Sequence, residues 1–239
     1  MKRRLLLISN SKPHGGGYLD HCEEAIKAFL GPIKNILFFP FALQDWEGYA
    51  SVARERFFRM GIKLVSVRDD EVIFRMNEGI ETAEAFFVGG GNTFRLLMEL
   101  LKTEPGGEVV LSQLRNRIFA GIPYIGTSAG ANLACPTIMT TNDMPIVYPK
   151  TFNALDVFPY QINPYYIDPD PSSQHMGETR DVRLKEFHEE HETPIVALRE
   201  GAWLRMENGR THLGGENGAK LFYRGSNPIE LYQGAWFKF

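Results

Sequence analysis

Short apolar runs alternate with amphipathic stretches over the first 130 residues of the chain. The apolar runs predict strands at 5–8, 35–39, 63–67, 85–88 and 122–125. Between these runs, apolar residues recur at helical spacing, which predicts helices at 20–30, 46–60, 92–102 and 112–119. Short buried strands that alternate with helices are typical of a parallel sheet with helices on both faces.

The pattern changes after Ala134. Residues 136–177 are rich in Pro, Asn, Asp and Tyr and show little periodicity. A further helix is predicted at 179–190, and a strand follows at 194–198. The tail contains short strand-like runs separated by Gly and Asn, at 203–206, 211–213, 220–223 and 229–232. No linker or internal repeat divides these parts, so the sequence predicts one α/β domain over residues 1–239.

The composition excludes several classes of protein. The chain has 239 residues, of which 44% are hydrophobic, so extensive disorder is not expected. The net charge is −3 and no basic stripe is present, which argues against a nucleic-acid partner. No apolar run approaches the roughly 20 residues that span a bilayer, and the run at 5–8 is short for a secretion signal. Two cysteines without a C-x-x-C pair favour a reducing compartment, so we expect a cytoplasmic protein without a membrane partner.

The stretch Gly126-Thr127-Ser128-Ala129-Gly130 carries the strongest chemical signal. It has the spacing G-x-S-x-G, with a predicted strand before it and a short helix after it, which is the context of a nucleophile elbow. So tight a turn admits only small residues around the serine and pushes the Ser128 hydroxyl out above the sheet edge. The alternative is a plain Gly/Ser turn that leads into a helix, and the strand–turn–helix context favours the nucleophile.

A second glycine-rich loop, Gly89-Gly90-Gly91, also follows a strand and leads into a helix. It lacks the G-x-G-x-x-G spacing and a nearby lysine, so phosphate binding has little support. Glycines allow backbone N–H groups to approach a reacting carbonyl closely. We therefore expect Gly90 and Gly91 to form an oxyanion hole together with the N–H of Ala129.

The histidines leave a second hypothesis open. His14-Gly15-Gly16-Gly17 is similar to the HGGG loop of esterases, which would pair Ser128 with His212 as the base. However, this loop precedes Ser128 by more than 100 residues and follows the first strand. His188 and His191 are three residues apart with no evident third ligand, so no metal site is expected. His21, in the first predicted helix, is far in sequence from these motifs.

Several long motifs resemble the peptidase E family of α-aspartyl dipeptidases. They lie at 125–136, 140–147, 158–159, 161–164 and 177–180, with earlier matches at 7–11 and 88–94. The resemblance implies a fold similar to class I glutamine amidotransferases, a three-layer sandwich with a mainly parallel central sheet. It also implies cytosolic hydrolysis of dipeptides with N-terminal aspartate, with no cofactor or metal. We expect a small peptide as substrate, and a monomer or a homodimer.

The resemblance also implies roles for individual residues. Ser128 is the nucleophile, and Arg180 binds the substrate's aspartyl carboxylate, since a guanidinium can hold a carboxylate through two hydrogen bonds. Without the motif at 177–180, the simplest interpretation of Arg180 would be an ion pair with Glu178 or Asp181. Asn92, in the matching stretch at 88–94, is assigned to substrate binding, and Glu200 matches the acidic member of the family's triad.

One position departs from the family pattern. The family's base is a histidine directly after Asn-Pro, whereas this chain has Tyr165 there. Tyrosine has a reference pKa of about 10 and is a poor base at neutral pH. We hypothesise that His175 activates Ser128 and that Asp170, or else Asp168, orients the imidazole; Glu200 is the alternative acid. Tyr165 also keeps open a catalytically inactive protein that binds aspartyl ligands through Arg180.

Overall fold

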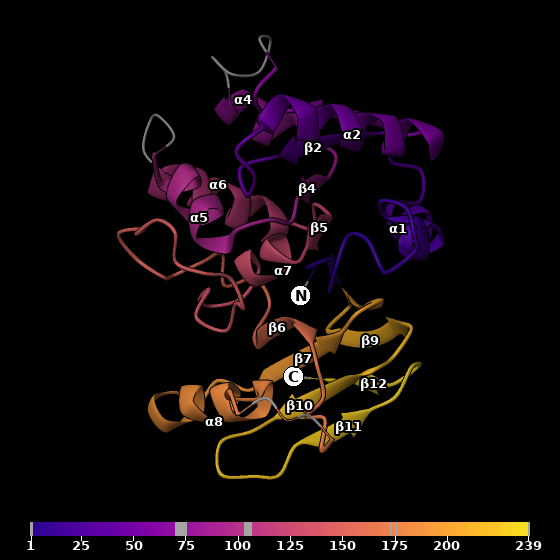
Figure 1. Cartoon of the computed structure of the whole chain (residues 1–239). Helices are drawn as coiled ribbons and strands as arrows, with labels where there is room; N and C mark the ends of the chain where they lie inside the picture. The colour runs from indigo at the N-terminus through magenta and orange to yellow at the C-terminus, as the bar shows by residue number, and fades with distance from the viewer. Residues whose placement is uncertain (1, 70–75, 103–106, 173, 175, 239) are drawn as a thin grey trace.

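The computed structural model describes residues 2–69, 76–102, 107–172, 174 and 176–238. Figure 1 shows two parts in contact. The indigo-to-magenta N-terminal half lies above, and the orange and yellow C-terminal segments lie below. None of the described helices is long and apolar enough to cross a membrane.

The large sheet has eight strands in the order β12-β9-β8-β1-β5-β4-β2-β3. Five neighbouring strands are parallel: β1 (Leu5–Ile8), β5 (Tyr124–Thr127), β4 (Phe86–Val88), β2 (Asn35–Phe39) and β3 (Lys63–Ser66). The tail extends this sheet on the β1 side by antiparallel strands β8 (Ala202–Glu207), β9 (Arg210–Gly215) and β12 (Trp236–Phe237). The mainly parallel central sheet predicted from the sequence is therefore confirmed.

Helices cover both faces of this sheet, because the parallel strands are apolar on both sides. One face packs against η1 (Asp20–Cys22), α1 (Glu23–Leu30) and α2 (Trp46–Arg59). The other packs against α4 (Met76–Thr82), α5 (Thr93–Lys102), α6 (Gly107–Phe119) and α7 (Ala129–Leu133). Alternate residues of β1 show the division: Leu6 and Ile8 belong to the first core, and Leu5 and Leu7 to the second.

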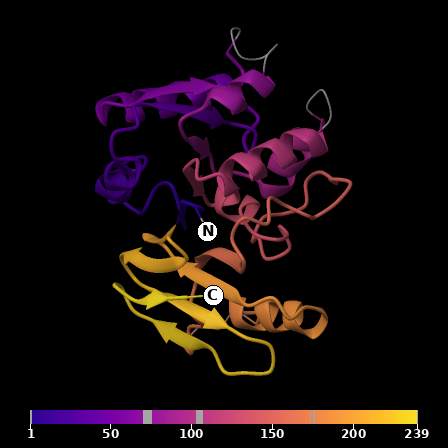
Figure 2. The same cartoon turned by 180° about the vertical axis from the view of Figure 1, so that it is seen from behind.

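A second sheet has four strands in the order β11-β10-β7-β6. It consists of β11 (Ile229–Leu231), β10 (Ala219–Phe222), β7 (Ile195–Arg199) and β6 (Gln161–Tyr166), with α8 (Arg180–Glu190) against it. On β7, Val196 and Leu198 join the core that lies under β1, whereas Ile195 and Ala197 face the cluster that includes Leu184 of α8. Figure 2 shows the same arrangement from behind, with this sheet below the N-terminal half.

The structure also corrects some element boundaries. The helix expected at 112–119 begins at Gly107, and the elements α4 and β12 were not predicted. Neither was β6, which lies inside the stretch without periodicity. Its Gln161 and Asn163 are only 1% and 2% exposed, and their side-chain nitrogens donate to Thr137, Thr140 and Asn142. Buried polar residues hid this strand from a hydrophobicity pattern.

Candidate active site

Ser128 lies at the turn between β5 and α7 with φ 51° and ψ −108°. Positive φ is uncommon for a residue with a side chain and is typical of a nucleophile elbow. The Ser128 N–H donates to the carbonyl of Ile8 at 2.9 Å, and the Ser128 carbonyl accepts from the N–H groups of Ala131 and Asn132 at 2.9 and 3.0 Å. The surrounding backbone therefore holds this strained conformation in place.

The two glycines that flank the elbow have no space for a side chain. A Cβ on Gly126 would lie 2.4 Å from the Gly130 carbonyl oxygen, and one on Gly130 would lie 2.2 Å from the Val88 carbonyl oxygen. Both obstacles are backbone atoms, which cannot rotate away. The expectation that only small residues fit this turn is confirmed.

The second glycine loop lies directly against the elbow. A Cβ on Gly90 would be 3.1 Å from Cβ of Ser128, and Gly91 has φ 135° with the Ala42 carbonyl oxygen 2.6 Å from its hypothetical Cβ. Ala129 is the first residue of α7, where an N–H has no acceptor within the helix. The structure thus places Gly90 and Ala129 next to Ser128, while Gly91, the next residue of the loop, lies against Ala42.

Asn92 follows this loop, and its side-chain amide forms two hydrogen bonds. Its Oδ1 accepts from the Arg95 N–H at 3.0 Å, which caps α5, and its Nδ2 donates to the Met144 carbonyl at 2.8 Å. Asp143, one residue before Met144, accepts from the N–H and hydroxyl of Thr93 at 2.7 and 2.5 Å. Asp143 lies in the motif at 140–147, where the sequence alone assigned it no role.

Tyr165, at the family's histidine position, lies at the edge of the same site. It has φ 51°, and its N–H donates to the Ser9 hydroxyl at 2.9 Å. Burial, followed by the nearby carboxylates of Glu200 and Asp143, raises the pKa of the Tyr165 phenol. The phenol is therefore protonated at neutral pH and is unsuited to take a proton from Ser128.

Glu200 is positioned by a residue that sequence reasoning missed. Asn10, just after β1, donates from Nδ2 to Glu200 Oε1 at 3.2 Å and accepts the Gly201 N–H at 2.7 Å. Close by, both ring nitrogens of His21 are buried without a hydrogen-bond partner among the described residues. Burial lowers the His21 pKa, while Glu216, Asp20 and Glu200 act in the opposite direction.

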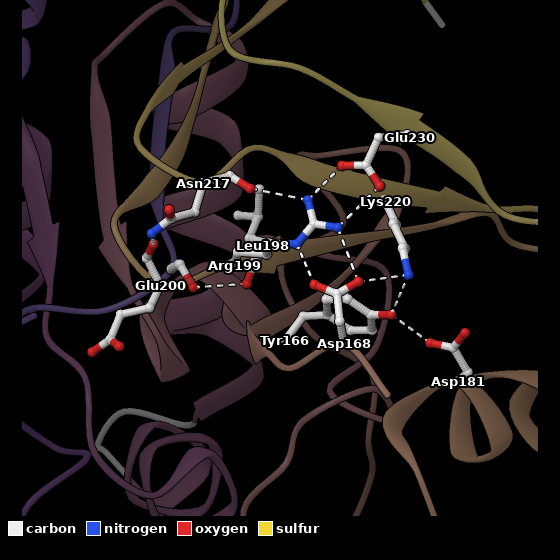
Figure 3. Close-up of polar contacts among 10 residues, drawn as sticks. Tyr166, Asp168, Asp181, Leu198, Arg199, Glu200, Asn217, Lys220 and Glu230 are labelled. Atoms are coloured by element: carbon white, nitrogen blue, oxygen red, sulfur yellow. Dashed lines mark hydrogen bonds and ion pairs between the residues drawn. The ribbon is translucent and has the colours of Figure 1, made fainter. Parts of the chain in front are cut away.

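An ion-pair network underlies this part of the site (Figure 3). Arg199 contacts Asp168 at 2.6 and 3.0 Å and Glu230 at 2.5 and 3.0 Å, so its guanidinium is shared between two carboxylates. Lys220 lies 2.6 Å from Asp168 and donates to the Tyr166 hydroxyl at 3.0 Å. These partners, the Arg199 hydrogen bonds first, lower the pKa of Asp168 to about 2. Both oxygens of Asp168 are therefore engaged by basic side chains.

The network extends to the beginning of α8. The Tyr166 hydroxyl donates to Asp181 at 2.5 Å, and Arg180 is the residue before it. Arg180 lines a cavity of about 370 Å³ together with Asp168, Asp170 and Arg183. Burial, and then the charge of Arg183, lowers the Arg180 pKa, and its guanidinium has no hydrogen-bond partner among the described residues. Ser128 does not line this cavity.

The remaining residues to place are the proposed acid Asp170 and the two histidines named as the base. The carboxylate of Asp170 is exposed and accepts from the Ser172 N–H and hydroxyl at 2.8 and 2.7 Å. His175 lies outside the described residues. His212, the base of the esterase hypothesis, is on β9, three positions from β5 in the sheet, or roughly 14 Å at about 4.8 Å per strand. It packs between Trp203 and Trp236, so the structure does not bring it to Ser128.

Comparison with known proteins identifies the family. The model of peptidase family S51 matches residues 5–214, which is most of the chain. The chain belongs to peptidase family S51. It is therefore a serine peptidase, and the resemblance noted in the sequence is confirmed.

Individual S51 relatives match over nearly their whole length. Peptidase E of Streptomyces coelicolor is 46% identical over 232 residues, which cover 97% of this chain and 92% of the relative. A Drosophila melanogaster protein named "Probable alpha-aspartyl dipeptidase" is 40% identical, with 96% and 93% covered. The crystal structure of a peptidase from an acI-B1 Actinobacterium superposes with a TM-score of 0.69 at 16% identity, covering 100% and 98%. This superposition supports the predicted fold class.

Proposed function

We propose that this S51 peptidase is an Asp-X dipeptidase that works through an acyl-enzyme on Ser128. The observation that carries the proposal is the strained elbow: Ser128 at φ 51°, with the Gly90 backbone against its Cβ. The name of the Drosophila relative, an alpha-aspartyl dipeptidase at 40% identity, supports the substrate class.

In the proposed reaction, Ser128 Oγ attacks the carbonyl carbon of the N-terminal aspartyl residue and its proton passes to a base. The N–H groups of Gly90, Gly91 and Ala129 stabilise the oxyanion of the tetrahedral intermediate. The C–N bond then breaks, and the protonated base gives its proton to the leaving amine. Water attacks the resulting ester, releases aspartate and returns a proton to Ser128 through the same base.

The base of the proposed reaction is His175. We assign it to His175 on the sequence alone, because Tyr165 is held protonated by burial and by two neighbouring carboxylates. Asp170 is the acid proposed to orient it, since Asp168 is occupied by Arg199 and Lys220. Glu200, held by Asn10, is the alternative acid.

Arg180 is the proposed ligand of the aspartyl side-chain carboxylate. Its guanidinium has a cavity in front of it and no competing carboxylate within hydrogen-bond distance among the described residues. The Asn92 amide is engaged with Arg95 and Met144, so any substrate contact would use its second amide hydrogen. A cytosolic location is also proposed, because Cys22 and Cys135 are buried, unpaired thiols that need no oxidising compartment.

The test is release of free aspartate from Asp-Leu, measured in parallel for the wild type, Ser128→Ala, His175→Ala and Tyr165→Phe. Activity in the wild type and in Tyr165→Phe, with loss in the other two variants, supports a dipeptidase with a relocated base. If Tyr165→Phe loses activity and His175→Ala keeps it, His175 is not the base.

An inactive wild type that still binds Asp-Leu overturns the peptidase proposal. That outcome supports the alternative of an aspartyl-ligand binding protein, for which the departure at Tyr165 is the motivating observation. Calorimetric titration of the wild type with Asp-Leu, run beside the activity assay, distinguishes the two cases.

A further inference from the structure

We propose that the carboxylate of Asp143 binds the α-ammonium group of the substrate's N-terminal residue. The inference rests on the proposed dipeptidase function and adds the subsite that would distinguish a free N-terminus from an internal aspartate. The ligand is a primary ammonium group one bond from the Cα that carries the scissile carbonyl.

Asp143 is held rigidly beside the oxyanion loop. Its Oδ2 accepts from the Thr93 N–H at 2.7 Å, from the Thr93 hydroxyl at 2.5 Å and from the Thr141 hydroxyl at 3.0 Å. Thr93 is buried and begins α5, directly after the loop that touches Ser128. Three donors on one oxygen fix the carboxylate's position and orientation.

The same segment is attached to β6 on its other side. Asn142 donates from Nδ2 to the Pro164 carbonyl, and its Oδ1 accepts from Asn163 Nδ2 at 2.7 Å. Asp143 therefore lies between the Ser128 loop and the residue after Pro164, which is Tyr165. The effect of the Asp143 charge on the Tyr165 phenol agrees with this placement.

The second carboxylate oxygen of Asp143 is left for a ligand. Its Oδ1 has no hydrogen-bond donor among the described residues, and no described lysine or arginine forms an ion pair with Asp143. The side chain is partly exposed, so a ligand can reach it. A carboxylate with one oxygen anchored and the other free suits a charge-assisted hydrogen bond from an ammonium group.

The charges around Tyr165 match those of an aspartyl N-terminus. Asp143 is attached to β6 through Asn142 at Pro164, and Arg180 adjoins Asp181, which accepts from the Tyr166 hydroxyl. The segment that carries Asp143 is thus attached at the residue before Tyr165, and the helix that begins with Arg180 is attached at the residue after it. An N-terminal aspartyl residue presents the complementary pair, an ammonium group and a side-chain carboxylate. A longer peptide has an uncharged amide in place of the ammonium group.

The experiment compares two ligands that differ only in the amino group, Asp-Leu and succinyl-Leu. Succinyl-Leu keeps the side-chain carboxylate and the scissile amide and lacks the ammonium. Binding of both is measured by calorimetry in Ser128→Ala, with and without Asp143→Asn, so that neither ligand is hydrolysed. Asparagine retains an oxygen that can accept from Thr93. Asp156→Asn, which neutralises a carboxylate paired with Arg115, is the matched control.

We expect Asp143→Asn to weaken Asp-Leu binding by about 100-fold, the usual scale for a hydrogen bond to a charged group, and to leave succinyl-Leu unchanged. The control is expected to change neither. In the active enzyme, Asp143→Asn is expected to remove the fall in kcat/KM that occurs as the substrate ammonium deprotonates, near a pKa of about 8. An equal loss of affinity for both ligands overturns the proposal and leaves Asp143 a structural role.

The outcomes also separate this inference from the proposed function. Binding of Asp-Leu that depends on Asp143, in a chain whose wild type hydrolyses nothing, supports the subsite and overturns the dipeptidase. Hydrolysis with no selective effect of Asp143→Asn supports the dipeptidase and overturns the subsite. If the wild type neither binds nor hydrolyses Asp-Leu, both are wrong.

Discussion

The hydroxyl of Tyr124 donates a 2.6 Å hydrogen bond to the carbonyl oxygen of Gly130. The bond joins the strand before Ser128 to the helix after it, and both partners are buried. Burial raises the pKa of Tyr124 well above its ordinary value, so its hydroxyl is a permanent donor. The conformation of the elbow is therefore stabilised by a buried side chain as well as by backbone hydrogen bonds.

Tyr124→Phe is expected to destabilise the protein by about 1–3 kcal/mol, because the Gly130 carbonyl loses its donor without gaining water. Urea unfolding followed by circular dichroism measures the change. Tyr148→Phe, at an 84% exposed position, is the control and is expected to have little effect. Equal stability of the Tyr124 variant and the wild type would show that the Gly130 carbonyl has another donor.

Gly130→Ala tests the space around the elbow. Its Cβ would lie 2.2 Å from the Val88 carbonyl oxygen, so β4 or α7 has to move. We expect a loss of about 1–3 kcal/mol or more of unfolding free energy, together with reduced hydrolysis. Gly16→Ala, whose Cβ would meet nothing closer than 3.5 Å, is the matched substitution and is expected to be tolerated. A melting temperature for Gly130→Ala equal to that of the wild type contradicts the prediction.

Arg180→Ala is expected to reduce the preference for Asp-Leu over Asn-Leu by about 10- to 100-fold in kcat/KM, since a charge-assisted pair with the substrate carboxylate is lost. The preference is measured by competition between the two dipeptides. Arg59→Ala, which removes an exposed guanidinium paired with Glu55 on α2 and outside this cavity, is the control. An unchanged preference in Arg180→Ala would remove Arg180 from substrate recognition.

Asp168 gives the ion-pair network a pH dependence. Its pKa is about 2 in the folded protein, below the value of about 3.9 for an unfolded chain. A carboxylate with a depressed folded pKa stabilises the fold above the unfolded pKa, and this stabilisation is lost as pH falls from about 4 to about 2. Since the side chain is 45% exposed, the effect is expected to be modest.

Asp168→Asn is therefore expected to be less stable than the wild type at pH 7, with the difference shrinking at pH 2–3. Thermal unfolding at several pH values measures it. A difference that stays constant from pH 7 to pH 2 would show that the loss comes from packing and not from the charge.

Much of the fold could be predicted from local pattern. The parallel strands are continuous apolar runs, and helices with one apolar face separate them, so their order along the chain indicates a helix-covered sheet. The turn that carries Ser128 could also be predicted, because a tight turn between a strand and a helix demands small residues around it. These features depend on neighbours within a few positions.

The strand β6 could not be read in this way. Its Gln161 and Asn163 are buried, and their side-chain nitrogens donate to partners 21 to 24 residues away. No pattern within β6 shows those partners. The division of the tail strands between two sheets could not be predicted either, because it also depends on distant partners. Strand β8 pairs with β1, and β10 pairs with β7.

The sequence by itself determined that Ser128 stands on a tight turn between a strand and a helix and that a glycine loop can approach it, because both follow from local steric demands. Only the tertiary structure decided which polar groups surround it. Asn10 meets Glu200 across 190 residues, and Thr93 meets Asp143 across 50. Glu200 follows β7 of the second sheet, and Asp143 lies in the loop between α7 and β6, so these contacts depend on how distant segments pack against the large sheet and not on any single segment.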